Sequence, residues 1–144
     1  MKKVVFICNG NMLRSQVAKA FYNKLVKDDS RAYSYGVSVE KQGKQGLKLF
    51  SYPGLGILFT ELKKYDLDIS NEHCEQLKEE YLADADKIVV MAEKEFIPVW
   101  LKNYKYEYWD GIPNPEVHTP QIIEDILILI RKKILKLINE SKLY

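Results

Sequence analysis

The chain has 144 residues, of which 47% are hydrophobic and 29% charged, so it is long enough to form a hydrophobic core, and we expect one domain over residues 1–144. Its formal net charge of +2 is too small to indicate nucleic acid or an anionic membrane surface as a partner. Charged residues interrupt the most apolar stretch, near Ile122, which excludes a membrane span there. The two cysteines, Cys8 and Cys74, lie far apart in sequence and are interpreted as thiols of a reducing compartment, so we expect a cytoplasmic protein.

Strand patterns alternate with helical patterns along the chain, which is typical of βαβ units in a parallel sheet. In chain order, the expected elements are a strand over 4–8, a helix over 15–25, a strand over 33–39, a loop over 40–52, a helix from 53 to 65, a short helix to 81, a strand over 87–91, a helical segment over 93–103, a strand over 104–109, a loop over 110–118 and a last helix from 120. The last helix carries isoleucine at every fourth position from 122 to 138, so it should pack on the sheet.

The most informative stretch follows the first strand. Cys8 ends that strand, residues 9 to 11 are turn formers, and Arg14 and Ser15 open a helix. Backbone N–H groups of a tight loop at a helix N-terminus converge on one point and bind oxyanions, and Arg14 adds a fork for two oxygens of a phosphate-like group. The same field favours thiolate over thiol, so we expect Cys8 to be an activated nucleophile.

This stretch resembles the signature loop of the low-molecular-weight protein tyrosine phosphatases, which the thioredoxin-coupled arsenate reductases share. The resemblance rests on Cys8-x5-Arg14-Ser15, on Gly10-Asn11 inside it and on the strand before it. It implies a three-layer α/β/α fold with a four-stranded parallel sheet. It also implies a phosphate-binding loop made of Asn9, Gly10, Asn11, Met12, Leu13, Arg14 and Ser15.

The resemblance further implies a network that holds the loop in shape. In the family, hydrogen bonds from a serine after the second strand and from a histidine hold the loop asparagine. By resemblance, Asn11 would be held in a left-handed conformation together with Ser15, Ser34 and His73. The alternative for His73 is an exposed residue at a helix start. The histidines and cysteines show no ligand spacing, so no metal site and no cofactor are expected.

One departure concerns the general acid. Phosphatases of this family carry Asp-Pro on the loop after the fourth strand, and that aspartate protonates the leaving oxygen. Here the matching dipeptide is Asn114-Pro115, and an amide cannot donate that proton. Asp110 stands four residues earlier and would reach the site only if the loop folds differently; otherwise it is a turn residue before Gly111. The aromatic residues that follow Asp-Pro in the family are absent, and the aromatic residues that could replace them are Phe50, Tyr52 and Phe59.

The sequence therefore predicts a phosphatase that hydrolyses phosphomonoesters through a cysteinyl-phosphate on Cys8, with a phosphorylated protein or a small phosphomonoester as partner. Arsenate reduction is the nearest alternative, but the relay needs two further cysteines and Cys74 is alone. A non-catalytic phosphate- or phosphoprotein-binding module is the second alternative, and Asn114 favours it. A phosphocysteine carrier would not require Arg14 and ranks last.

Overall fold

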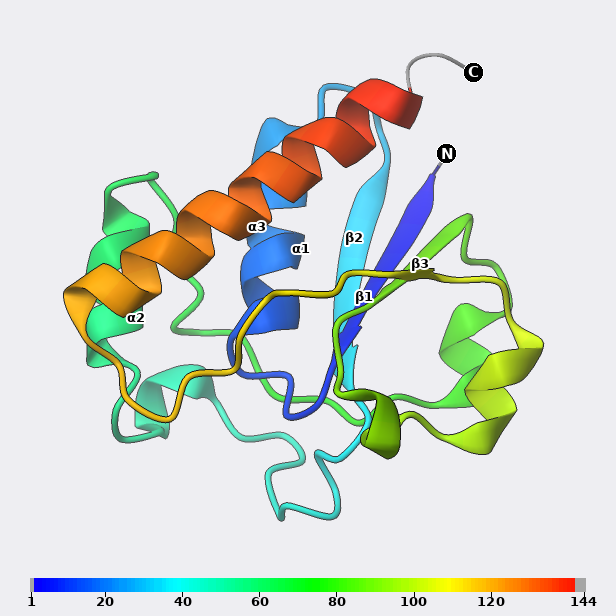
Figure 1. The fold of residues 1–144 in the computed structure, drawn as a ribbon, viewed down its shortest axis with the longest axis horizontal. Helices are drawn as coiled ribbons and strands as arrows, with labels where there is room; N and C mark the ends of the chain where they lie inside the picture. Colours follow the sequence, from blue (N-terminus) through cyan, green and yellow to red (C-terminus); the bar gives the residue numbers. More distant parts are fainter. Residues whose placement is uncertain (1, 142–144) are drawn as a thin grey trace.

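The computed structural model describes residues 2–141, and its centre is a four-stranded parallel sheet in the order β2-β1-β3-β4 (Figure 1). Residue pairs along the sheet include Cys8 with Gly36 and Ile7 with Val90, so the carboxyl ends of three strands meet at one edge. The strands are β1 (Lys3–Cys8), β2 (Arg31–Gly36), β3 (Lys87–Val90) and β4 (Glu107–Tyr108). The predicted parallel α/β sheet is confirmed.

One face of the sheet is covered by α-helices. They are α1 (Arg14–Leu25), α2 (Gly56–Lys63) and α3 (Pro120–Ser141). Figure 1 shows α3 running diagonally beside both α1 and α2. The predicted stripe on α3 is buried at Ile126, Ile130, Ile134 and Ile138, whereas Ile122 is 37% exposed and its neighbour Ile123 faces the core. None of the described helices is long and apolar enough to cross a membrane.

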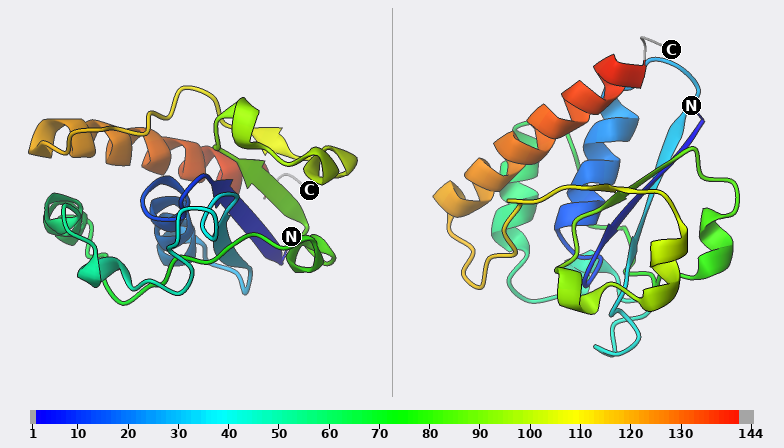
Figure 2. Two further views of the ribbon diagram at one scale, coloured as in Figure 1. Left: turned by 90° about the horizontal axis from the view of Figure 1, so that it is seen from below. Right: turned by 45° about the vertical axis from the view of Figure 1, so that its right-hand side comes forward.

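The other face carries a second, smaller core around Val5 and Ile7 of β1. Short 3-10 helices cover this face, as the left view of Figure 2 shows. They include η2 (Glu79–Leu82), η3 (Lys94–Phe96) and η4 (Val99–Asn103). The helical segment expected over 93–103 is thus two short turns, because Pro98 lacks the N–H that a continuous helix needs.

The prediction of a short helix up to residue 81 is wrong for most of its length. Residues 73–77 are extended and continue beside the end of β2, where Gly36 donates to Glu75 O (2.9 Å) and accepts from Leu77 N (2.8 Å). Long-range pairing overrides the local pattern here. This pairing with the end of β2 brings residues 73–76 to the edge of the sheet where the loop after Cys8 lies.

Candidate active site

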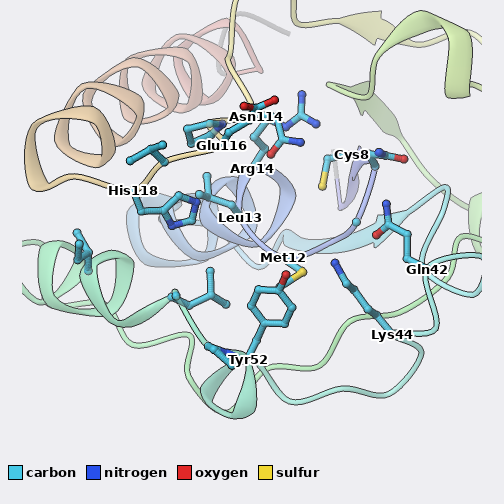
Figure 3. A pocket seen from close by; sticks show the side chains of 18 of the residues that line it. Cys8, Met12, Leu13, Arg14, Gln42, Lys44, Tyr52, Asn114, Glu116 and His118 are labelled. Atoms are coloured by element: carbon cyan, nitrogen blue, oxygen red, sulfur yellow. The ribbon is translucent and has the colours of Figure 1, made fainter.

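Cys8 is the last residue of β1 and Arg14 is the first residue of α1, with residues 9–13 as the loop between them. This loop forms the floor of a pocket of about 850 Å³ at the carboxyl edge of the sheet (Figure 3). The expected phosphate-binding residues divide into two groups. Asn9, Gly10, Met12, Leu13 and Arg14 line the pocket with Cys8, while Asn11 and Ser15 are fully buried and are not among the lining residues.

Ser15 is positioned to act on the cysteine sulfur. Its Oγ lies 2.9 Å from Cys8 Sγ, and both side chains are buried, with Cys8 only 2% exposed. A hydroxyl at this distance can donate a hydrogen bond to a thiolate and stabilise its charge. The structure therefore couples the cysteine to a hydrogen-bond donor on the first turn of α1.

Asn11 organises the loop. It is fully buried and has a φ of 55°, in the left-handed region that asparagine tolerates better than most residues. Its Nδ2 donates to Ser15 Oγ (2.8 Å) and Ser34 Oγ (3.1 Å), and its Oδ1 accepts from the backbone N–H of Glu75 (2.8 Å) and from Gln16 Nε2 (3.2 Å). The structure thus brings together Asn11, Ser15 and Ser34 as the resemblance implies.

The expectation that the side chain of His73 holds this network is wrong. That side chain is exposed, and only the backbone carbonyl of His73 takes part, accepting from Gln16 Nε2 (3.0 Å). Residues 73 and 74 are extended, so His73 points outward and Cys74 inward. Gln16 Nε2 and the backbone N–H of Glu75 make the hydrogen bonds to Asn11 that were expected from the histidine. Gln16 lies in the first turn of α1 and is fully buried, which the sequence alone does not show.

Gly36 allows the loop to approach the end of β2. A Cβ atom at this position would lie 2.6 Å from the backbone O of Asn9 and 2.8 Å from the backbone N of Asn11. Both contacts are closer than real Cβ atoms make with backbone, so only glycine fits. The position of the loop therefore depends on this residue as well as on the side-chain network.

Arg14 is fixed from the side of β3. It is 4% exposed, its Nη1 donates to Met91 O (2.7 Å), and its Nη2 donates to both carboxylate oxygens of Glu93 (2.7 and 3.2 Å). Since a guanidinium has five N–H donors, these bonds leave others for a ligand in the pocket. Sequence reasoning missed Glu93, because its role depends on the end of β3 lying next to α1.

The loop over 110–118 forms one side of the pocket. Asn114, Glu116 and His118 line it, and Figure 3 shows them on the side away from Lys44. Asp110 is not among the lining residues, so its tentative catalytic assignment is not supported. It is exposed, and its Oδ1 accepts from the N–H of Gly111 (2.9 Å), whose φ is 79°. Asp110 is thus the turn residue of the alternative interpretation.

The opposite side of the pocket is built from residues 42–57. Of the three aromatic residues considered above, only Tyr52 lines the pocket. Phe50 is 58% exposed outside it, and Phe59 packs against the main core. The ammonium of Lys44 lies 4.9 Å from the centre of the Tyr52 ring. This side therefore combines an aromatic surface with a positive charge.

The second cysteine does not belong to the pocket. Cys74 is a fully buried free thiol, and burial raises its pKa to about 11. A thiol with a raised pKa is a poor nucleophile at neutral pH. Among residues 2–141, no group of three or more histidine, cysteine or acidic side chains is placed to hold a metal ion.

The geometry described above can be compared with known proteins. The family model for low molecular weight phosphotyrosine protein phosphatase matches residues 3–140. The chain belongs to this family. Arsenate reductase 1 of Staphylococcus haemolyticus is 26% identical over 116 residues, which cover 79% of this chain and 77% of that protein.

Solved structures of the same fold are similar over almost the whole chain. Wzb of Vibrio vulnificus, in complex with benzylphosphonate, superposes with a TM-score of 0.80 at 21% identity and covers 96% of this chain and 98% of its own. The YwlE arginine phosphatase of Geobacillus stearothermophilus has a TM-score of 0.78 at 17% identity, with 99% and 94% covered. Family and relatives together support an enzyme of the phosphatase and arsenate reductase superfamily.

Proposed function

We propose that this protein hydrolyses phosphomonoesters through a cysteinyl-phosphate intermediate on Cys8. The observation that carries the proposal is the meeting of the Cys8 sulfur, the Ser15 hydroxyl and the Arg14 guanidinium around one loop at the start of α1. A module that only binds phosphate would need the loop and the arginine, but it would not need a thiol held 2.9 Å from a hydroxyl.

The proposed reaction has two steps. Cys8 Sγ attacks phosphorus, an S–P bond forms, and the ester P–O bond breaks with its electron pair going to the leaving oxygen. Water then attacks the phosphocysteine, the S–P bond breaks, and phosphate and the thiolate are released. Arg14 and the backbone N–H groups of residues 9–14 stabilise the charge on the equatorial oxygens, and Ser15 stabilises the departing sulfur.

Asn114 limits which esters react well. It lines the pocket from the loop after β4, where the family carries its general acid, and an amide cannot protonate the leaving oxygen. Esters whose leaving group departs as a stable anion need no proton, so aryl phosphates should react best. Tyr52, Met12 and Ile57 supply aromatic and apolar surface for such a group. The benzylphosphonate complex of the Vibrio vulnificus relative supports the same choice.

Arsenate reductase-like activity is the second candidate, because similar proteins of Staphylococcus and Oceanobacillus carry that name. Arsenate has the shape and charge of phosphate and would enter the same loop. Reduction also needs two electrons from thiols, and the only other cysteine, Cys74, is buried with a raised pKa. This candidate therefore requires an external thiol to attack the arsenate adduct on Cys8.

Hydrolysis of p-nitrophenyl phosphate in the presence of EDTA tests the proposal. We expect turnover by the wild type, loss in Cys8→Ser, and retention in Cys74→Ala, which is the matched cysteine control. Absence of turnover in the wild type and in Asn114→Asp would leave the phosphate-binding module as the better account. Arsenate-dependent consumption of an added thiol, without ester hydrolysis, would favour the second candidate.

A further inference from the structure

His118 lies two residues before α3 and lines the same pocket as Cys8. Thr119, which follows it, caps the helix: its Oγ1 accepts from the N–H of Ile122 (3.2 Å) and its backbone O accepts from the N–H of Ile123 (3.0 Å). Ile123 is fully buried in the core, so the backbone next to His118 is held by the helix. Figure 3 shows the imidazole projecting from this loop into the pocket. Its position is therefore set by the start of α3.

The two nitrogens of the His118 ring have different surroundings. Nδ1 is buried and has no hydrogen-bond partner within residues 2–141, so Nε2 is the nitrogen left for a ligand in the pocket. In a neutral imidazole, one nitrogen carries the proton and the other is an acceptor. Buried N–H groups without an acceptor are rarer in proteins than buried acceptors without a donor, so we assign the proton to Nε2. The ring thus presents an N–H donor to the pocket.

The leaving oxygen of a bound ester lies between the two sides of this pocket. Cys8 is on the pocket floor and the attack on phosphorus is in line, so the leaving oxygen points away from the sulfur and toward the space that the side chains of both sides line. The electron pair of the breaking P–O bond accumulates on that oxygen. A positioned N–H donor stabilises this developing charge more than it stabilises the uncharged ester oxygen, and that difference lowers the barrier.

Two other side chains that line the pocket, Asn114 and Lys44, also carry N–H donors. Asn114 is exposed, whereas the His118 side chain is half-buried. Lys44 lies on the opposite side, where its ammonium is 4.9 Å from the centre of the Tyr52 ring, and this charge ends a flexible four-carbon chain. A donor that is already in place costs no reorganisation when charge develops. The imidazole is therefore the best preorganised of the three donors.

We propose that His118 is a catalytic residue that donates a hydrogen bond from Nε2 to the leaving oxygen as the P–O bond breaks. The proposal rests on the phosphatase function proposed above and adds a residue to its first step. The Cys8 sulfur forms the S–P bond, and the electron pair of the P–O bond goes to the leaving oxygen. His118 keeps its proton, and the released oxyanion takes one from water. This hydrogen bond supplies part of the stabilisation that a proton donor would give, so esters with basic leaving groups depend on it most.

The test measures how kcat/KM depends on the basicity of the leaving group, in a series of aryl phosphates from p-nitrophenyl phosphate to phenyl phosphate. His118→Leu removes the donor. With phenyl phosphate it should lower kcat/KM by about ten- to a hundredfold, the cost of a lost hydrogen bond to a charged atom. With p-nitrophenyl phosphate the loss should be only roughly two- to tenfold, because the nitro group withdraws charge from the leaving oxygen. A plot of log kcat/KM against leaving-group pKa should therefore be steeper in His118→Leu than in the wild type.

Two amide variants separate the nitrogens of the ring. His118→Gln places an amide N–H near the position of Nε2 and should restore most of the rate with phenyl phosphate. His118→Asn is the matched control, because it places the same amide near the buried Nδ1, and it should keep the steep plot. Lys44→Leu removes the donor of the opposite side, and the slope of its plot should equal that of the wild type whatever its kcat/KM.

Equal slopes in the wild type and in His118→Leu would overturn the proposal, because a structural role lowers kcat/KM by the same factor for every ester. A plot that steepens in Lys44→Leu and not in His118→Leu would also overturn it. If His118→Leu does not fold, the amide variants decide, and equal slopes in His118→Gln and His118→Asn would count against Nε2 as the donor. Absence of p-nitrophenyl phosphate turnover by the wild type would instead refute the phosphatase function, and this proposal with it.

Discussion

Replacing Asn11 tests whether the buried network holds the phosphate loop. Asn11→Ala removes four side-chain hydrogen bonds. Ser15 keeps its contact with the cysteine, and Gln16 keeps two backbone acceptors. The groups that lose their hydrogen-bond partner are therefore the Glu75 N–H and the Ser34 hydroxyl. One buried unsatisfied donor costs about 1–3 kcal/mol, and the weakened hydroxyl contacts add about 1 kcal/mol. Holding alanine at a φ of 55° adds about 1 kcal/mol more.

The expected loss in the free energy of unfolding is therefore about 3–5 kcal/mol for Asn11→Ala. Asn11→Gly is the matched control, since it removes the same bonds but accepts the left-handed backbone, and it should be more stable than the alanine variant by about 1 kcal/mol. Urea unfolding followed by circular dichroism measures both. A loss below about 0.5 kcal/mol for Asn11→Ala would refute the network as the support of the loop. Equal stabilities of the two variants would refute the contribution of the left-handed backbone at residue 11.

Three further substitutions test other parts of the site. Glu93→Gln should lower the free energy of unfolding by about 1–3 kcal/mol and kcat/KM by about tenfold, because the buried Arg14 cation loses its carboxylate partner. Urea unfolding and steady-state kinetics measure the two effects, and values equal to those of the wild type would contradict the prediction. Burial raises the pKa of the Cys74 thiol from 9.0 to about 11, so the stability that the neutral thiol contributes is complete below pH 9 and is lost as the pH rises to about 11. The unfolding midpoint should therefore fall less steeply between pH 9 and 11 in Cys74→Ala than in the wild type. Equal slopes in the two proteins would refute this contribution of Cys74. Asn114→Asp should raise the hydrolysis of phenyl phosphate about a hundredfold with little change for p-nitrophenyl phosphate, and no gain would indicate that another group already donates the proton.

The sequence predicted best what depends on neighbouring residues. The strand to Cys8, the loop and the helix at Arg14 follow from local apolar periodicity and turn formers, and the structure has all three. The left-handed conformation of Asn11 was implied by the resemblance, and asparagine tolerates it better than most residues. Asn114, which the resemblance matches to the general acid of the family, lines the pocket.

What the sequence could not predict depends on segments that are distant along the chain. The pairing of residues 73–77 with the end of β2 turns His73 outward and brings the Glu75 amide to Asn11. The partner of Arg14 is Glu93, which is 79 residues away, and no local pattern marks it as an ion-pair partner. Such contacts follow from sheet order and register, which hydrophobic periodicity does not specify.

The proposed mechanism requires that Cys8 becomes phosphorylated during turnover. Rapid acid quenching of the reaction with p-nitrophenyl phosphate, followed by intact-protein mass measurement and peptide mapping, tests it most directly. We expect one added phosphoryl group, on the peptide that contains Cys8, in the wild type and in Cys74→Ala, and none in Cys8→Ser. Turnover without a phosphorylated intermediate, or with the phosphoryl group on another residue, would refute Cys8 as the nucleophile.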